Sequence, residues 1–216
     1  MSSVALPENG LPETALQEPW QTAERQHVAM QFGMWCFLAT ETLFFGGLIL
    51  FYTVARITHT AGFTIGAREA EVTFGTVNTV VLLTSSLTMA IAERAVREAL
   101  TPLARMMFAL TLVLGIAFLT IKGFEYHSDI DKHLVPGPGF KLTETGASQF
   151  WAFYWTATGV HACHMVIGLG VVARMLLIPR AELPTRWTTA EGSALYWHLV
   201  DVVWVVLYAL LYLVGR

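Results

Sequence analysis

Five long apolar stretches account for most of the chain. Each is long enough for an α-helix to cross the hydrocarbon core of a bilayer, which takes about 20 residues. They cover residues 32–55, 72–92, 103–121, 150–173 and 194–214. The short alternating strands of a membrane β-barrel would give a different pattern. We therefore predict an all-α fold, an integral membrane bundle of five transmembrane helices within residues 31–216, preceded by a polar, cytoplasmic segment, residues 1–30.

The longest connection lies between the third and fourth stretches, at residues 122–149. It contains the run Pro136-Gly137-Pro138-Gly139, which cannot continue a helix and marks a turn. Its alternating acidic and basic residues predict a solvated surface loop, which serves either as a connector or as a docking surface. In this interpretation Arg105 and Lys122 mark the two ends of the third helix.

Composition excludes several classes of protein. Charged residues make up 13% of the chain, whereas soluble domains have about 25%, and the mean hydropathy is +0.54. The net charge is −3 and there is no basic block, so we expect no nucleic-acid partner. Cys36 and Cys163 both lie in apolar stretches and form neither a disulfide framework nor a paired-cysteine metal motif.

A few ionisable side chains interrupt the apolar stretches. Because a helix rises about 1.5 Å per residue, position along a stretch converts to depth. Glu41 in the first stretch and His161 in the fourth are then expected near the middle of the membrane. His164 lies one turn further, at a depth similar to that of Asp201 in the fifth stretch, and His198 precedes Asp201 by three residues. An ionised carboxylate at mid-bilayer is strongly unfavourable, so we expect Glu41 to be protonated, hydrogen-bonded or both.

Each of these groups has a functional and a structural interpretation. Glu41, with His161 and His164 as candidate partners, either binds and releases a proton or only links helices. The two histidines have the i, i+3 spacing of a metal-binding pair, but they cannot both be axial ligands of one haem. His198 and Asp201 share that spacing, and we expect them to pair directly on one helix face. We assign no catalytic residue and no metal site.

Small and polar residues predict close contacts between helices. Asn78 and Ser85 share a face of the second stretch, where hydrogen bonds to another helix are worth about 0.5–2 kcal/mol in lipid. The predicted structural polar network consists of Asn78, Ser85, Glu125, His198 and Asp201. Glycines are expected to let a second helix approach the fourth one closely, at Gly159, Gly168 and Gly170.

Arginines near the span ends are candidates for binding anionic lipid headgroups, with ordinary boundary anchoring as the alternative. These residues are Arg25, Arg174, Arg180 and Arg186. If the N-terminus is cytoplasmic, seven basic residues lie inside and six outside. This difference is too small to decide the orientation.

Five motifs occur in order along the chain. They are GMWCFLATETLFFGGLILFY (33–52), NTVVLLTSSLTMA (78–90), KGFEYHS (122–128), TGVHACHMVIGLG (158–170) and EGSALYWHLVDVVWVVLYALLYLVG (191–215). Together they resemble subunit III of the haem–copper respiratory oxidases, the cytochrome c oxidase type, in its five-helix bacterial form. The resemblance covers nearly all of the chain from Gly33 onward.

The resemblance implies a non-catalytic subunit that binds no cofactor of its own. It implies that oxidase subunits I and II are partners, with haem and copper in the partner subunits, that phospholipids bind, and that the chain supports proton uptake and the stability of the complex. Other respiratory complexes in a supercomplex stay open as further partners. Glu41 matches the family's buried reactive carboxyl, His161 and His164 its fourth-helix histidines, and His198 and Asp201 its last-helix pair.

The resemblance also implies a location and a topology. It places the chain in the bacterial inner membrane, with a cytoplasmic N-terminus and a periplasmic C-terminus. Seven-helix members of the family have two further N-terminal helices that help to form a lipid cleft. In this chain we expect such a cleft only if another subunit supplies those helices.

Other functions stay open. Quinol oxidases and nitric oxide reductases have similar small subunits. A stand-alone proton or ion transporter would use Glu41, Asp201 and the histidines as a relay, although the sequence lacks the internal repeat of many transporters. A membrane cytochrome would need a haem between His198 and a histidine of the fourth stretch.

Overall fold

The computed structural model describes residues 23–213, and the regular elements in this range are all helical. The long helices are α1 (Ala23–Thr58), α3 (Val72–Arg97), α4 (Thr101–Asp131), α5 (Ala147–Leu177) and α6 (Trp187–Tyr208). Shorter elements are α2 (Thr60–Glu69), the 3₁₀ turn η2 (Leu183–Arg186) and the π-helical turn η3 (Ala209–Leu213), which continues α6. Within residues 23–213, five helical spans are long and apolar enough to cross a membrane, which confirms the predicted all-α bundle.

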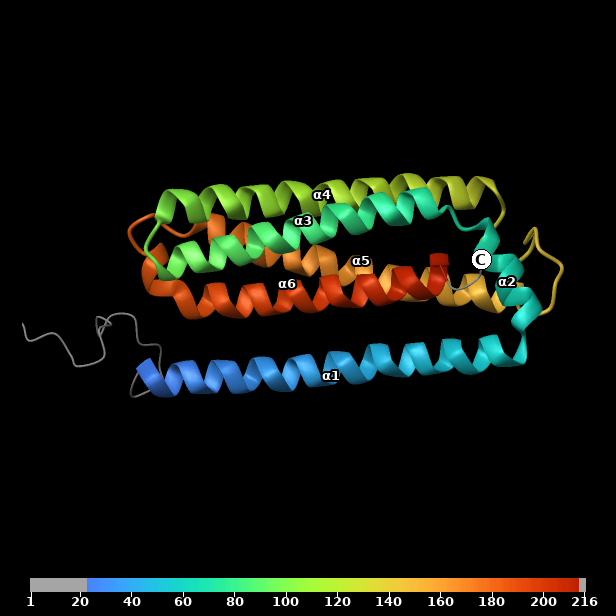
Figure 1. Cartoon of the computed structure of the whole chain (residues 1–216), viewed down its shortest axis with the longest axis horizontal. Helices are drawn as coiled ribbons and strands as arrows, with labels where there is room; N and C mark the ends of the chain where they lie inside the picture. Colours follow the sequence, from blue (N-terminus) through green and yellow to red (C-terminus); the bar gives the residue numbers. More distant parts are fainter. Residues whose placement is uncertain (1–22, 214–216) are drawn as a thin grey trace, which may run out of the picture.

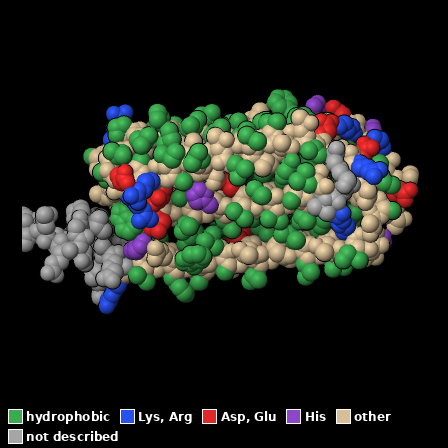
Figure 2. Space-filling view, viewed as in Figure 1, with side chains coloured by type: hydrophobic (Ala, Val, Ile, Leu, Met, Phe, Trp, Pro, Cys, Tyr) green, Lys and Arg blue, Asp and Glu red, His purple; other side chains and the backbone are tan. Residues whose placement is uncertain are grey.

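The long helices lie side by side along one axis (Figure 1). α1 leads into α2 at one end, which we call the α2 end of the bundle. α3 returns to the opposite end, α4 and α5 run out and back, and α6 finishes beside α2. Charged side chains gather at both ends, and the visible face between them is largely apolar (Figure 2). This distribution is expected of a protein that spans a hydrocarbon layer.

α1 is the most peripheral of the five spans. Of the residues in its most apolar stretch 6% are buried, whereas the other four spans have 28–44%. α1 contacts mainly α6 and α5, and Figure 1 shows it set apart from α3 and α4. Phe32, Leu43 and Ile57 are among its exposed large side chains. Most of its surface is therefore available to lipid or to another protein chain.

The packed centre of the bundle is built around the tryptophans of α6. Trp197 is buried where two helices approach each other through glycines, Gly115 of α4 and Gly168 of α5. A Cβ atom at Gly115 would lie 2.9 Å from the Trp197 ring, and one at Gly168 would lie 3.1 Å from it. Gly159 and Gly170 have no atom within 4 Å of such a Cβ, so the prediction of close packing was wrong for these two residues.

The third predicted helix ends later than the sequence indicated. α4 continues to Asp131, ten residues beyond the predicted end, so the loop expected at 122–149 is non-helical only from 132 to 146. Lys122 is 2% exposed and lies inside the bundle instead of marking a rim. The remaining loop turns at Gly137, Gly139 and Gly146, whose positive φ angles favour glycine. At the other end of the chain, α1 begins at Ala23, within the segment expected to precede the bundle, and residues 1–22 lie outside the described range.

Candidate functional site

Glu41 pairs with a histidine of a neighbouring helix. Its Oε2 atom lies 3.1 Å from Nε2 of His164, and each side chain is 18% exposed. Both residues are near the middle of their helices, α1 and α5. The partner of Glu41 is thus His164. His161, which was expected at the same depth as Glu41, lies one turn away along α5.

The hydrogen bonds of His164 determine how many protons the pair holds. Nδ1 lies 2.9 Å from the carbonyl oxygen of Val160, which can only accept, so Nδ1 carries a hydrogen. The contact between Nε2 and Glu41 then requires one further hydrogen. It belongs either to a neutral glutamic acid beside a neutral imidazole or to an imidazolium beside a carboxylate. In both cases one hydrogen lies between Nε2 of His164 and the carboxyl group of Glu41.

His161 is buried among aromatic rings. Its ring lies 5.1 Å from that of Trp204 and 5.5 Å from that of Phe118, centroid to centroid. Among the described residues neither of its nitrogens has a hydrogen-bond partner. His161 and His164 line the same small apolar pocket, between α1, α5 and α6, together with Phe45. The two histidines therefore have different surroundings: His164 is paired with Glu41, and His161 packs against aromatic rings.

α3 and α6 are joined by an antiparallel series of polar contacts. Ser86 shares a hydrogen bond of 2.8 Å with Nδ1 of His198. Nε1 of Trp197 donates to Ser85 over 3.1 Å. Further along, Trp204 donates to Thr79 and Tyr208 bonds to Thr76. α6 is therefore tied to α3 along its second half, from Trp197 to Tyr208.

The direct pair expected between His198 and Asp201 is not formed among the described residues, and Nδ1 of His198 bonds to Ser86 of α3 instead. Asp201 is 4% exposed; Ser86 lies beside it, but among the described residues its oxygens have no hydrogen-bond partner of normal geometry. The same is true of both side-chain atoms of the buried Asn78. Glu125 bonds instead to Tyr154 and Tyr212. In the described part of the chain, the five residues predicted as one polar network are therefore not joined by hydrogen bonds to one another.

A second polar site, which we call the Lys122 cluster, lies near the α2 end. It consists of Lys122, Glu125 and Asp129 on one face of α4, Tyr154 on α5 and Tyr212 on η3. The three charged-type side chains are only 1–2% exposed. Nζ of Lys122 donates to the hydroxyl of Tyr154 over 2.9 Å and to that of Tyr212 over 2.8 Å. Its ammonium also lies over the ring of Trp204, 5.4 Å from the centroid.

The carboxyl groups complete the Lys122 cluster. Oε2 of Glu125 forms an ion pair with Nζ at 3.1 Å, although its angles are not those of a hydrogen bond. Oε1 of Glu125 accepts from Tyr212 over 2.5 Å and lies 2.8 Å from Tyr154. Oδ2 of Asp129 also lies 2.8 Å from the Tyr154 hydroxyl. Three helical segments thus meet at one buried cation, in an arrangement that is costly to disrupt.

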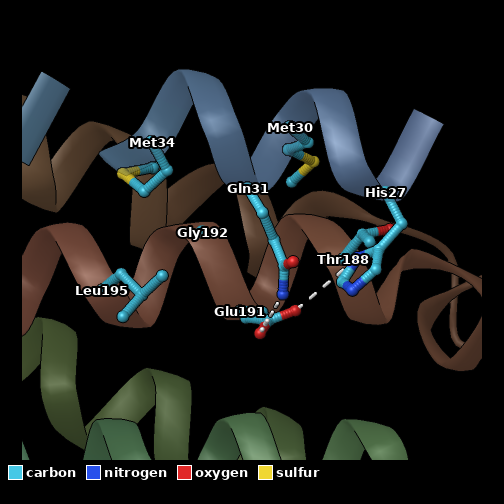
Figure 3. Close-up of a pocket in the computed structure, with 8 residues that line it drawn as sticks. All are labelled: His27, Met30, Gln31, Met34, Thr188, Glu191, Gly192 and Leu195. Atoms are coloured by element: carbon cyan, nitrogen blue, oxygen red, sulfur yellow. Dashed lines mark hydrogen bonds and ion pairs between the residues drawn. The ribbon is translucent and has the colours of Figure 1, made fainter. Parts of the chain in front are cut away.

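A third polar site joins α1 to the bundle at the end opposite α2. Figure 3 shows His27 and Gln31 reaching from α1 toward Glu191 on α6, beside a small pocket also lined by Met30 and Met34. Nε2 of Gln31 lies 3.5 Å from Oε1 of Glu191, and Nδ1 of His27 lies 4.0 Å from Oε2. Nη2 of Arg97 on α3 approaches the same glutamate to 3.2 Å.

Most of the arginines suggested for lipid binding lie on the surface. Arg25, Arg174 and Arg180 are exposed and Arg186 is half-buried, all at the end opposite α2. Within residues 23–213 no three histidine, cysteine, aspartate or glutamate side chains form a group suited to hold a metal ion.

The sequence interpretation missed Lys122, Asp129, Tyr154 and Tyr212. One signal was available: Lys122, Glu125 and Asp129 are spaced i, i+3, i+7, which places them on one face of any helix that passes through them. Nothing comparable indicated Tyr154 or Tyr212. Glu191 was also missed, because its partners are 94 residues away or more in the sequence and only the fold brings them together.

The family model of cytochrome c oxidase subunit III matches residues 14–216. The chain belongs to this family. Subunit III of the cytochrome bo(3) ubiquinol oxidase of Pseudomonas aeruginosa is 30% identical over 190 residues, which are 85% of this chain and 84% of that protein. Cytochrome c oxidase subunit 3 of Synechocystis is 32% identical and covers 84% of this chain and 74% of the relative. The corresponding protein of Bacillus subtilis is 32% identical and covers 85% of each.

Membership of the subunit III family establishes an association with other subunits of a respiratory oxidase, and the five apolar spans establish a membrane protein. The motif around Glu41, the pair of histidines on α5 and the segment containing His198 and Asp201 all lie within the matched region. The resemblance drawn from the five motifs is therefore confirmed.

Proposed function

We propose that this chain is the third subunit of a bacterial cytochrome c oxidase and that it contributes no redox centre to the reaction. It packs on subunit I and associates with subunit II, which hold the haem and copper groups. The observation that carries the proposal is the family match over residues 14–216, together with a proton-holding pair at the centre of the least covered helix.

The Glu41–His164 pair supports a role in proton uptake. It lies on α1, whose outer face is apolar and largely exposed, so a neighbouring subunit packed on α1 would lie beside the pair. In this proposal the pair retains a proton close to the neighbour and so supports proton delivery to the catalytic subunit. Phospholipids fill the rest of the exposed apolar surface, with the arginines at the end opposite α2 facing headgroups on the cytoplasmic side.

The proposed function is tested by isolating the complex through an affinity tag on this chain from its native membrane. We expect haem–copper subunits I and II to copurify in equal amounts with the chain, and the complex to oxidise reduced cytochrome c. Absence of haem–copper subunits from the purified material would contradict the proposal. A tagged membrane protein of similar size from another complex serves as the control for nonspecific copurification.

A quinol oxidase is the second candidate, because the relative from Pseudomonas aeruginosa is a subunit of a ubiquinol oxidase at 30% identity. The same purified complex distinguishes the two. Oxygen consumption with ubiquinol, and none with reduced cytochrome c, would favour the quinol oxidase. We expect the opposite result.

A further inference from the structure

The Lys122 cluster contains two carboxyl groups but only one cation. Its three charged-type side chains are almost fully buried, so an excess negative charge could not be screened by water. The positions of the hydrogens decide how the cluster avoids this charge. They can be assigned by counting the donors and acceptors around the hydroxyl of Tyr154.

Tyr154 has more partners than one hydroxyl can serve as a donor. Its oxygen lies 2.9 Å from Nζ of Lys122, 2.8 Å from Oε1 of Glu125 and 2.8 Å from Oδ2 of Asp129. A phenol has one hydrogen to donate and accepts through its lone pairs. Lys122 can only donate, so the single phenol hydrogen is left for two carboxyl groups. One of these groups must therefore supply a hydrogen of its own.

Glu125 has the environment of an ionised carboxylate. Its Oε1 atom accepts from Tyr212 over 2.5 Å, and its Oε2 atom is ion-paired with Lys122 at 3.1 Å. Asp129 has neither feature: within residues 23–213 it forms no ion pair, and Lys132, the next cation along the chain, is ion-paired with Glu71. The extra hydrogen is therefore best placed on Asp129.

We propose that Asp129 is a proton-binding site, in which the neutral carboxylic acid donates its hydrogen to the hydroxyl of Tyr154. Tyr154 then donates to Glu125 and accepts from Lys122 and Asp129, so that its hydrogen-bonding capacity is filled. Lys122 and Glu125 balance each other, and the cluster is neutral. The titratable groups facing the site are Lys122, Glu125 and Tyr126 on α4, Tyr154 on α5, Tyr212 on η3 and Lys132 just after α4.

Occupancy of this site is coupled to the contact between α4 and α5. Asp129 lies two residues before the end of α4, next to the exposed Ile130 and Asp131, so its proton can exchange near the surface of the α2 end. Loss of the proton would leave two oxygens, on Asp129 and Glu125, competing for the one hydrogen of Tyr154. Because the phenol belongs to α5 and the carboxyl groups to α4, the helices would separate there.

The first test compares two neutralising substitutions in the purified complex. Asp129→Asn keeps a donor toward Tyr154 without changing the charge, so we expect the thermal release of the chain to be unchanged. Glu125→Gln removes the partner of a buried ammonium, so we expect a large drop in the release temperature. If Asp129→Asn fails to assemble or is destabilised as much as Glu125→Gln, Asp129 is a charged counter-ion and the proposal is overturned.

A second test uses Lys122→Gln, which removes the cation. If Glu125 is the ionised group, adding Glu125→Gln to Lys122→Gln makes the cluster neutral again, and assembly should recover. Adding Asp129→Asn to Lys122→Gln leaves the charge on Glu125, and assembly should not recover. The reverse pattern would overturn the proposal. The infrared spectrum gives an independent readout: the carbonyl band of a protonated carboxyl group should be lost in Asp129→Asn, and an unchanged band would refute the assignment. None of these measurements depends on the electron donor. The assignment of Asp129 can therefore be refuted while the proposed function holds, and the proposed function can be refuted while the assignment holds.

Discussion

Glu41 on α1 and His164 on α5 share one hydrogen between Oε2 and Nε2, which lie 3.1 Å apart. The other ring nitrogen of His164, Nδ1, donates to the carbonyl oxygen of Val160. The contact between Glu41 and His164 lies near the centre of a helix that is otherwise largely exposed. It therefore connects α1 to the rest of the bundle at the depth where a polar group has fewest alternatives to a protein partner.

The first prediction concerns the hydrogen that this pair shares. Glu41→Gln replaces the acid with an amide, which can donate to Nε2 of a neutral His164, so we expect normal assembly and near-normal initial turnover. Glu41→Leu leaves His164 without its partner at a cost of about 1–3 kcal/mol, and we expect weaker retention of the chain. Oxygen-consumption traces of the purified complexes measure both effects. A collapse of the initial rate in Glu41→Gln would instead indicate obligatory proton transfer through the carboxyl group.

The second prediction tests the close approach of α4 to α5 and α6. Gly115→Ala would place a Cβ atom 2.7 Å from Leu169 and 2.9 Å from Trp197, so a packed core would have to shift. We expect a loss of about 1–3 kcal/mol in stability, because overpacking costs this much. Gly123→Ala on the same helix is the matched control, since a Cβ there meets no atom within 4 Å. Thermal denaturation of the two variants should differ clearly, and equal stability would show that the core yields at Trp197.

The third prediction concerns a second link between α1 and the bundle. The hydroxyl of Tyr52, a buried side chain, donates to the carbonyl of Leu210 in η3 over 2.7 Å. Tyr52→Phe keeps the ring and removes this bond, so we expect a loss of about 0.5–1.5 kcal/mol and faster amide exchange in η3. Phe51→Leu, at an exposed neighbouring position, is the control and should change neither. Unchanged exchange in Tyr52→Phe would mean that η3 is held by packing alone.

The sequence predicted the number and approximate positions of the spans because a run of apolar residues is sufficient to identify a helix that crosses a bilayer. It also predicted that Glu41 would find a histidine on a neighbouring helix. It could not choose between His161 and His164, because rise along a helix gives depth but not the rotation of one helix against another. That rotation depends on packing, here on α5 meeting the tryptophans of α6.

The Lys122 cluster was not predicted from the sequence because its residues are charged. Lys122, Glu125 and Asp129 lie within a segment dense in polar residues, and their density favoured a solvated loop over a buried helix end. The burial of these groups depends on Tyr154 and Tyr212, which come from two other elements and stabilise them by hydrogen bonds. His198 illustrates the same limit, since its partner is Ser86 of another helix and not the Asp201 beside it.

The last prediction concerns Glu191, where α1, α3 and α6 meet. This glutamate contacts Arg97 at 3.2 Å and Gln31 at 3.5 Å, while Arg97 and His27 both lie against the ring of Trp187. Glu191→Gln removes the charge that attracts Arg97, and we expect a loss of about 1 kcal/mol, because the arginine is partly solvated. Since His27 and Gln31 are the α1 side chains that approach Glu191, the effect should be concentrated at residues 27–31.

Hydrogen exchange of the purified complex provides the measurement for Glu191→Gln. Exchange should rise at the start of α1 and stay unchanged in the α4–α5 region, and raising the salt concentration should produce a smaller version of the same change in the unmodified protein. Glu98→Gln is the matched control, because Glu98 lies at the same end of the bundle and forms an exposed i, i+4 pair with Arg94. Equal protection of residues 27–31 in both variants would show that α1 is held there by Met30, Met34 and the Trp187 ring instead of by charge.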